Sequence, residues 1–508
     1  MEILNSILTW VMKKRIHQME FFMKYPVEVQ DELLKNLLLM GRPTEYGSRY
    51  RFDELGTYDD FRRRVPIVSY EDIAPDIERI MKGEQNVLWP TPIKWFSKSS
   101  GTTNARSKFI PVSEEALEEC HYKGGKDLYS IYVNNHPDTK IFTGKSLGVG
   151  GSIQVNHFDP SSSTYFGDVS AVIMQNLPKW AEFIRTPSLE TALMNDWEPK
   201  IEQIARETAR ENVTHIAGVP TWTVLLLQHI TRLEGKSSIL EVWPNLEVFF
   251  HGAVAFHPYR SLFKTLIPSD SMRYWETYNA SEGFFGIQDR SNSEDLLLML
   301  DYGVFYEFIP QTDHEAPEAQ AVGLDQVEVG KNYAMVITTN SGLWRYRIGD
   351  TIRFTSISPF RIRISGRTKH FMNAFGEEVI VENAETAVTR ACEATGAVID
   401  NFTAAPVYLE KGKRGGHEWI IEFRAQPRSL EEFTGVLDDT LRKINSDYDA
   451  KRANDLALVA PRIHAVAEGT FYNWMKGRGK LGAQNKVPRL SNNREYVDQI
   501  LAMTGLVN

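Results

Sequence analysis

Residues 97–112 read Ser-Lys-Ser-Ser-Gly-Thr-Thr-Asn-Ala-Arg-Ser-Lys-Phe-Ile-Pro-Val. Two serines, a glycine and two threonines stand together in this stretch, and cationic side chains follow them. Hydroxyl groups and a backbone free of bulky side chains can surround the oxygens of a polyphosphate. The stretch lacks the GxxxxGK[ST] spacing of a Walker A loop, and it leads into a strand instead of a helix. It is therefore either an anion-binding loop or a flexible hairpin tip.

The residues on both sides of this loop predict a mixed α/β domain. Residues 93–96 and 109–112 are short apolar runs with the character of strands. A helix is expected over residues 114–132, with Ser113 as its N-cap. Residues 1–40 also have helical character, either as packed helices or as a membrane-surface helix. Further strands are predicted at residues 246–250 and 333–338.

The pattern changes after Gly366 and predicts a second, smaller domain. A helix is expected to open at Gly376, because apolar residues recur there with the 3.6-residue period: Ile380, Ala384, Ala387, Val388 and Ala391. Residues 417–423 alternate as one strand face does, and residues 430–444 form a second amphipathic helix. We expect a large α/β domain at residues 1–366 and a small, mobile, two-layer α+β domain at residues 367–508.

Length and composition limit the class of protein. A chain of 508 residues is too long for one hydrophobic core. A net charge of −9 argues against a general nucleic-acid or membrane-surface binder, so neither partner is expected. The chain has two cysteines without metal-ligand spacing, no apolar run of about 18 residues and no basic segment before its first apolar residues. These features predict a cytoplasmic protein.

Two further segments carry aromatic, small and acidic residues in an order that suits a nucleotide. Residues 274–286 read Tyr-Trp-Glu-Thr-Tyr-Asn-Ala-Ser-Glu-Gly-Phe-Phe-Gly, which can stack a base, form a turn and present a carboxylate to Mg²⁺. The alternative is a buried aromatic strand. Residues 344–350 read Trp-Arg-Tyr-Arg-Ile-Gly-Asp, and a carboxylate after a glycine turn can accept both hydroxyls of a ribose. The alternative is a surface turn in which the arginines pair with the aspartate.

Two segments nearer the C-terminus can move charge toward a phosphate. Residues 364–378 lie at the expected domain boundary, where Gly366 allows a hinge and Arg367 can meet a ribose or a phosphate. Residues 479–489 form a basic, glycine-containing segment that can bring a lysine onto a phosphate. The alternatives are a plain linker and a solvated basic tail.

Taken together and in this order, the five segments resemble the adenylate-forming enzymes. The resemblance is closest to the acyl-acid amido synthetases of plants, which conjugate jasmonate, auxin and benzoates to amino acids. Residues 99–103 and 108–111 are similar to the Ser-Ser-Gly-Thr-Thr and Lys-Phe-Ile-Pro of that family's phosphate loop. Matches also occur to Tyr-Arg-x-Gly-Asp, to Ser-Gly-Arg with Asn-Ala-Phe-Gly-Glu-Glu, and to Gln-x-Lys-x-Pro-Arg: residues 346–350, 365–378 and 484–489.

The resemblance implies a role for each candidate residue. The ATP phosphates would lie against Ser99, Ser100, Gly101, Thr102 and Thr103. Around the nucleoside, Tyr278 would lie against adenine, with Ser281 in the same segment, and Asp350 would hold the ribose. Glu282 would bind Mg²⁺. The turn at Gly252 and Ala253 would border the acyl pocket.

The implied catalytic residues are Arg367 and Lys486, with Lys480 as a rival for the mobile lysine. The implied reaction adenylates a small carboxylic acid with ATP and Mg²⁺, and then transfers the acyl group to an amino acid. An acyl-CoA ligase and a silent nucleotide-binding homologue are the alternatives. The acid, the amine, the oligomeric state and the roles of His251 and His257 stay open. A metal site at these two histidines is not expected, because no third ligand is evident.

Overall fold

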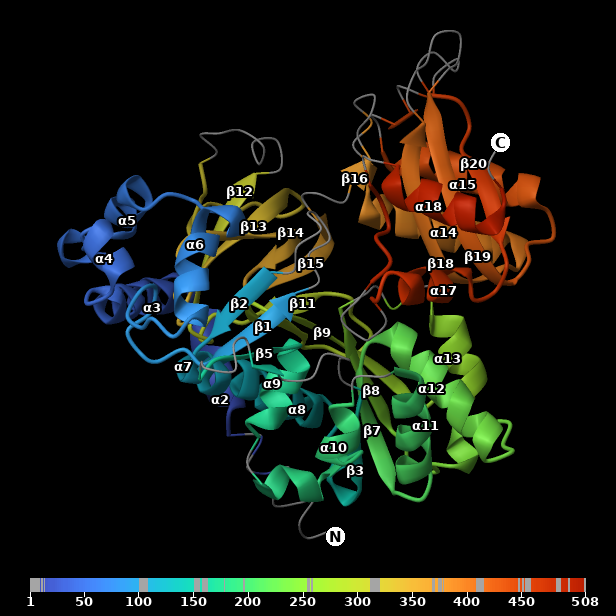
Figure 1. The fold of residues 1–508 in the computed structure, drawn as a ribbon, viewed down its shortest axis with the longest axis horizontal. Coiled ribbons are helices and arrows are strands. Elements are labelled where there is room, and N and C mark those ends of the chain that lie inside the picture. Colours follow the sequence, from blue (N-terminus) through green and yellow to red (C-terminus); the bar gives the residue numbers. More distant parts are fainter. Residues whose placement is uncertain are drawn as a thin grey trace. The chain divides into compact units, whose positions relative to one another are not determined.

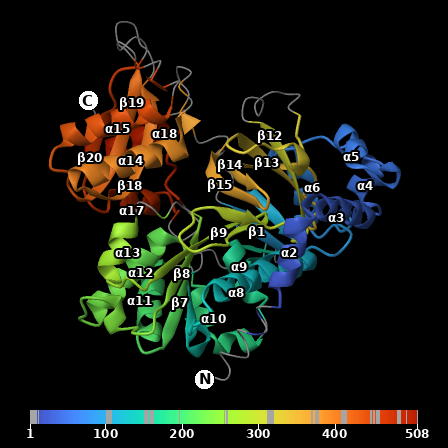
Figure 2. The same ribbon diagram turned by 180° about the vertical axis from the view of Figure 1, so that it is seen from behind.

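The computed structural model describes residues 10–506 apart from a set of short gaps: 11, 13, 100–107, 150–155, 158–162, 178, 195–196, 254–255, 257–258, 311–319, 368–370, 373–376, 378, 408–414, 446–447, 450–451, 453–457, 481–485 and 492–493. The chain divides into two compact units. The first unit comprises residues 1–253, 266–364 and 482–484, and the second comprises residues 254–265, 365–481 and 485–508. Figures 1 and 2 show the fold from opposite sides.

An eleven-stranded sheet forms the centre of the first unit, and one half of it is parallel. From its edge inward, the parallel half consists of β6 (Arg185–Thr186), β3 (Lys145–Val149), β7 (Val213–Gly218), β8 (Val248–Gly252) and β9 (Arg273–Ala280). Parallel strands require crossover connections, which here contain helices. In both views α11 (Trp197–Thr208) and α12 (Pro220–Leu233) lie to one side of β7 and β8, and α8 (Lys123–Asn135) lies to the other (Figures 1 and 2).

The other half of this sheet continues beyond β9 through shorter connections. Its strands follow in the spatial order β10 (Gly283–Gln288), β11 (Leu296–Leu298), β15 (Phe360–Arg367), β14 (Tyr346–Ile357), β13 (Asn332–Thr339) and β12 (Val304–Pro310). β9 and β10 pair antiparallel across the two-residue turn Ser281-Glu282. The strand predicted at residues 333–338 is confirmed as β13.

A second sheet in the first unit has the order β2-β1-β5-β4. β1 (Trp95–Ser99) pairs antiparallel with β2 (Lys108–Val112), from Trp95 opposite Val112 to Ser99 opposite Lys108. β5 (Tyr165–Gly167) and β4 (Asn156–His157) complete the sheet. The two strands predicted on either side of the hydroxyl-rich loop are thus confirmed, although β1 begins and ends later than expected. The loop residues Ser100, Gly101, Thr102 and Thr103 lie outside the described residues.

The helical character predicted for residues 1–40 is confirmed, over the residues that the structure describes, by α2 (Ile16–Lys24) and α3 (Pro26–Gly41). Three further helices follow: α4 (Glu45–Arg49), α5 (Tyr58–Arg64) and α6 (Tyr70–Met81). Leu34, Leu37 and Leu38 of α3 are buried in the main core, which favours the packed-helix interpretation over a membrane-surface helix. Within the described parts of the chain, no helix combines the length and the apolarity that a membrane span needs.

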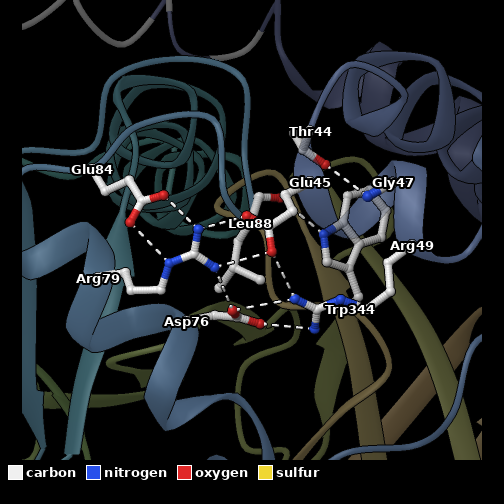
Figure 3. Close-up of polar contacts among 9 residues, drawn as sticks. All are labelled: Thr44, Glu45, Gly47, Arg49, Asp76, Arg79, Glu84, Leu88 and Trp344. Carbon is white, nitrogen blue, oxygen red and sulfur yellow. Dashed lines mark hydrogen bonds and ion pairs between the residues drawn. The ribbon is translucent and has the colours of Figure 1, made fainter.

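Ion pairs link α4 to α6 at the surface, as Figure 3 shows. Arg79 of α6 donates to Glu45 of α4 at 3.0 Å and to Glu84 at 2.8 Å, and Arg49 donates to Asp76 at 3.1 Å. The two pairs of Arg79 are exposed, and exposed pairs contribute only about 0–1 kcal/mol each. They therefore fix the register of the two helices more than they stabilise the fold.

Trp344 provides the apolar contact beneath these helices. Its indole packs edge-to-face on Phe52 at 4.6 Å. Its Nε1 donates to the Leu88 carbonyl oxygen at 3.0 Å, a contact shown in Figure 3. A Cβ atom added at Gly41 would lie 2.6 Å from the same indole ring. The end of α3 can therefore approach Trp344 only because position 41 is glycine.

The second unit contains β18 (Val398–Val407), β19 (Gly416–Ala425) and β20 (Arg462–Val466). One face of this sheet packs on α14 (Val381–Thr395) and α15 (Leu430–Ile444), and the other packs on α17 (Thr470–Gly477) and α18 (Glu495–Thr504). The predicted two-layer arrangement is therefore wrong, because this unit has three layers. Both faces of β19 are apolar: Trp419 and Ile421 point to one core and Ile420 to the other.

The start of α14 also differs from the prediction. The helix begins at Val381, five residues after Gly376, and Ile380 belongs with Val379 to the short strand β17, which pairs with β16 (Phe371–Met372). The side chain of Asn383 accepts a hydrogen bond from the Ile380 N–H at 3.3 Å and so marks the helix start. The apolar period from Ala384 onward is correctly helical.

His215 of β7 predicts how the stability of the first unit depends on pH. Its Nε2 lies 3.0 Å from the Tyr129 hydroxyl, and burial lowers its pKa to about 3. The folded state therefore keeps the imidazole neutral, whereas the unfolded chain takes up a proton below its ordinary pKa near 6.5. This contribution to stability is fully present above about pH 6.5 and is lost as the pH falls toward about 3.

We expect His215→Asn to reduce the loss of unfolding free energy between pH 6.5 and pH 4, by up to about 1.4 kcal/mol per pH unit. Urea unfolding of both proteins at several pH values measures this difference. Above pH 7 the two stability curves should run parallel. An unchanged slope below pH 6 would contradict the assignment.

Candidate functional site

The carboxyl ends of the parallel strands form the first part of the candidate site. From β3 the chain continues to β6 on one side, whereas β7 and β8 follow one another on the other side of β3. The sheet order therefore reverses between β3 and β7, and ligands of open α/β sheets bind beyond the strand ends at such a point. Gly218 ends β7 there, and a Cβ added to it would lie 2.9 Å from the Cβ of Val149. Only a glycine allows these two strand ends to approach so closely.

Gly252 ends β8 at the same edge of the sheet, and Ala253 follows it. A Cβ at Gly252 would lie 2.5 Å from the Thr277 carbonyl oxygen, so this position requires glycine. Ala253 is exposed and has a φ of +72°, which is uncommon for a residue with a side chain. Such a conformation persists where the surrounding structure imposes it, often at ligand sites. The predicted acyl-pocket turn is thus a constrained turn at a strand end that suits a ligand.

Tyr278 and Asp350 meet directly, although they are 72 residues apart in the chain. The Tyr278 hydroxyl donates to Asp350 Oδ2 at 2.7 Å, and both side chains are buried. The Tyr278 ring packs edge-to-face on Phe285 at 5.1 Å. The structure therefore brings together the residue expected beside adenine and the residue expected to hold the ribose.

An irregularity in β14 determines where Asp350 points. β13 and β14 pair as Ala334 with Thr351 and then as Val336 with Arg347, so β14 contains extra residues between the two pairs. Gly349 lies in this bulge with a φ of +87°. A bulge re-aims the side chains beside it, and a positive φ favours glycine. The Gly-Asp pair is thus part of a bulged strand, and the prediction of a simple glycine turn needs this correction.

Arg345 does not serve as the partner of Asp350 that one interpretation of the sequence suggested. Its guanidinium donates to Glu307 through Nε at 2.8 Å and through Nη2 at 2.7 Å. Its Nη1 donates to the carbonyl oxygens of Arg62 and Val65. This buried pair fixes the strand that carries Asp350.

Ser281 and Glu282 form the tight turn between β9 and β10. Ser281 is buried and Glu282 is half-buried, three and four residues beyond Tyr278. Among the described residues no group of three or more His, Cys, Asp or Glu could hold a metal ion by itself. A single carboxylate fits Mg²⁺ nonetheless, since this ion is usually bound by one or two carboxylates together with substrate phosphates.

The remaining candidates lie elsewhere in the chain. Ser99 is the last residue of β1. Gly366, with a φ of +150°, and Arg367 end β15. Lys486 is exposed, whereas Lys480 is partly buried. The pKa of Lys480 is lowered, mainly by burial and to a smaller extent by the positive charge of Arg478.

Two residues without an assigned role lie close to Lys486. Burial raises the pKa of Glu385 to about 7, against the opposing effects of Arg489 and Lys486. Arg489 ends the late basic motif, so the sequence drew attention to it without indicating its partner. Nothing in the sequence indicated a role for Glu385, because one glutamate in an amphipathic helix resembles any other.

His251 is buried and packs against Phe249, and His257 lies outside the described residues.

Three family models match the chain in consecutive order. They are the GH3 family N-terminal domain over residues 15–272, the GH3 family central domain over residues 297–367 and the GH3 family C-terminal domain over residues 382–495. Tyr278 lies between the N-terminal and central matches, and Lys480 lies within the C-terminal match.

Relatives and a solved structure extend over nearly the whole chain. An indole-3-acetic acid-amido synthetase, GH3.4 of Arabidopsis thaliana, is 25% identical and aligns with 94% of this chain and 91% of its own length. A 4-substituted benzoates-glutamate ligase, GH3.12 of the same plant, is 23% identical over 91% of this chain and 92% of its own. The GH3.15 acyl acid amido synthetase has the same fold, with a TM-score of 0.80, 19% identity and coverage of 97% and 96% of the two chains.

We expect Asp350→Ala to weaken ATP binding about tenfold or more, because a hydrogen bond to a charged group contributes about 1.5–3 kcal/mol. Isothermal titration calorimetry measures the change. Tyr278→Phe is the matched variant, since it removes one hydrogen bond to the carboxylate but keeps the carboxylate itself; its effect should be smaller. Unchanged affinity in Asp350→Ala would remove this residue from the ribose role.

Proposed function

The chain belongs to the GH3 family, and from this membership we propose that it activates a carboxylic acid with ATP and joins the acyl group to an amino acid. The observation that supports this most is the contact between Tyr278 and Asp350. Tyr278 lies in the same segment as Glu282, whereas Asp350 comes from β14. Residues suited to bind a base (Tyr278), a ribose (Asp350) and a metal (Glu282) therefore lie in the same region of the first unit. The enzyme is an adenylate-forming ligase of the amido synthetase type.

The reaction has two half-reactions. In the first, an oxygen of the substrate carboxylate attacks the α-phosphorus of ATP, and the bond to pyrophosphate breaks. In the second, the amino nitrogen attacks the carbonyl carbon of the acyl-adenylate, the bond to AMP breaks, and the nitrogen loses a proton. The adenylate supplies the leaving group, so the protein needs no nucleophile of its own. Catalysis then depends on positioning and charge.

Each candidate residue has a place in this scheme. The loop Ser99–Thr103 binds the phosphates, Tyr278 lies against adenine beside Ser281, and Asp350 accepts the ribose hydroxyls. Glu282 holds Mg²⁺, which when bound neutralises charge on the phosphate oxygens. Gly252 and Ala253 border the acyl pocket.

Arg367 and Lys486 supply positive charge to the adenylation step. We assign them to a small functional domain at residues 367–508, which moves relative to residues 1–366 between the half-reactions. Gly366 provides the hinge, because its φ of +150° is a conformation that other residues rarely adopt. We also propose a cytoplasmic location, because two cysteines far apart in the sequence offer no disulfide framework.

ATP–pyrophosphate exchange tests the proposal. Purified protein with Mg²⁺ should exchange labelled pyrophosphate into ATP only when a suitable acid is present. Indole-3-acetate and 4-substituted benzoates belong in the acid panel, since relatives are named for them. No exchange with any acid, in folded protein that binds ATP, would contradict adenylation.

The second half-reaction is tested by the mass of the product. With an active acid, addition of a mixture of amino acids should yield an amide and AMP. Formation of a thioester with coenzyme A, and of no amide, would instead identify an acyl-CoA ligase.

We expect Lys486→Ala to slow pyrophosphate exchange by about 10²–10³-fold, the loss typical when one positioned charge or donor is removed from a transition state. Lys480→Ala is the matched control, because it removes a lysine six residues upstream that is partly buried. Its exchange rate should stay within a few-fold of the wild type. If Lys480→Ala is the slow variant, the assignment of the mobile lysine is wrong.

A further inference from the structure

The segment that follows Lys486 is fastened to the sheet of the second unit. Thr403 of β18 donates its hydroxyl to the Pro488 carbonyl oxygen at 2.6 Å. The Ala404 N–H donates to the Arg489 carbonyl oxygen at 2.9 Å, and the Ser491 N–H donates to the Ala404 carbonyl oxygen at 3.1 Å. Leu490 pairs with Ala404 as a parallel bridge and is completely buried. Residues 488–491 thus extend the sheet along β18.

The side chain of Arg489 is the strongest point of this attachment. Its guanidinium lies over the Phe402 ring at 4.5 Å and donates to the Phe402 carbonyl oxygen at 3.1 Å. It also donates to the Asn401 side chain and, at 3.1 Å, to the Tyr259 hydroxyl. Its Nε lies 3.8 Å from Glu385 Oε1 of α14. A planar guanidinium group with this many contacts has little rotational freedom.

Arg489 confines Lys486 because the chain between them is short and stiff. An extended chain spans at most about 3.3–3.6 Å per residue, so the Lys486 backbone lies within about 11 Å of the Arg489 backbone. Pro488 has a fixed φ and restricts Val487 to extended conformations. Val487 also packs against the core formed by α17 and α18. Fixing Arg489 therefore fixes the point from which the exposed Lys486 side chain extends.

We propose that Arg489, with Glu385 as its carboxylate partner, is a positioning residue that holds Lys486 in place for adenylation. This inference depends on the proposed function for its catalytic part. Glu385 supports it because its Oε1 lies 3.8 Å from Arg489 Nε. Burial raises the pKa of the Glu385 carboxyl group, and the positive charges of both Arg489 and Lys486 oppose that rise. Arg489 itself is placed against Glu385, Asn401, Phe402 and Tyr259, and it acts through the lysine.

A double-mutant cycle in pyrophosphate exchange tests the catalytic part. Arg489→Gln should lower kcat for exchange by about tenfold or more with little change in KM for ATP. In a Lys486→Ala background the same substitution should change the rate less than twofold, because the group that it positions is gone. Glu385→Gln should follow the same pattern with a smaller effect, and it decides the case if Arg489→Gln does not fold.

Arg478 offers a matched control within the same unit. Its guanidinium also lies over an aromatic ring, that of Trp474 at 4.9 Å, and donates to Gln499 at 3.0 Å. Arg478→Gln should leave exchange within twofold of the wild type. Equal losses from Arg489→Gln in both Lys486 backgrounds, or an equal loss from Arg478→Gln, would mean a general structural role and overturn the inference.

Hydrogen exchange measured by NMR tests the anchor without activity. The Ala404 and Ser491 amides should exchange at least tenfold faster in Arg489→Gln and at the wild-type rate in Arg478→Gln. Unchanged protection in Arg489→Gln would overturn the anchor. A wild-type enzyme that lacks pyrophosphate exchange with every acid would overturn the proposed function, whereas an active enzyme indifferent to Arg489→Gln would overturn only this inference.

Discussion

The buried ion pair between Arg345 and Glu307 constrains much of the first unit. Both side chains are almost inaccessible to solvent, and removing either partner alone from such a pair costs about 3–5 kcal/mol. The pair joins β12 to the residue before β14, and the same guanidinium reaches the carbonyl oxygens of Arg62 in α5 and of Val65, which follows that helix. Arg345 has a φ of +46°, so the backbone accepts strain to make these contacts. The N-terminal helices, the sheet and the strand with Asp350 are thereby held in one arrangement.

The curvature of the large sheet brings two residues of the candidate site, Tyr278 and Asp350, into contact. Between β9 and β14 lie β10, β11 and β15, so a flat sheet would separate the two strands by about 19 Å at the usual spacing of 4.7–4.9 Å. Tyr278 and Asp350 are nevertheless in hydrogen-bond contact at 2.7 Å. The antiparallel half of the sheet must therefore curl strongly, as twisted strands and the bulge in β14 allow. In the second unit, the contacts of Arg489 with Phe402, Tyr259 and Glu385 hold the segment that follows Lys486 against β18.

The sequence predicted the local elements well where one strong signal dominated. The strands beside the hydroxyl-rich loop, the N-terminal helices, β13 and α15 were all expected from short-range patterns. The start of α14 was misplaced, because Ile380 continues the apolar period although it lies in a strand. The sequence pattern does not reveal the third layer of the second unit, because the alternation over residues 417–423 indicates one buried face, whereas Ile420 on the other face of β19 belongs to a second core.

By itself, the sequence determined the order of the motifs and hence the family, since residue types at fixed spacings are a property of the chain alone. Only the tertiary structure decided which of those residues meet. Asp350 accepts a hydrogen bond from Tyr278, whereas Arg345, five residues before Asp350, pairs with Glu307. Arg489 lies against Glu385 and Tyr259, which are far from it in the chain. Such pairings follow from sheet curvature, strand bulges and buried charges that must find partners, and these are settled only when the whole domain packs.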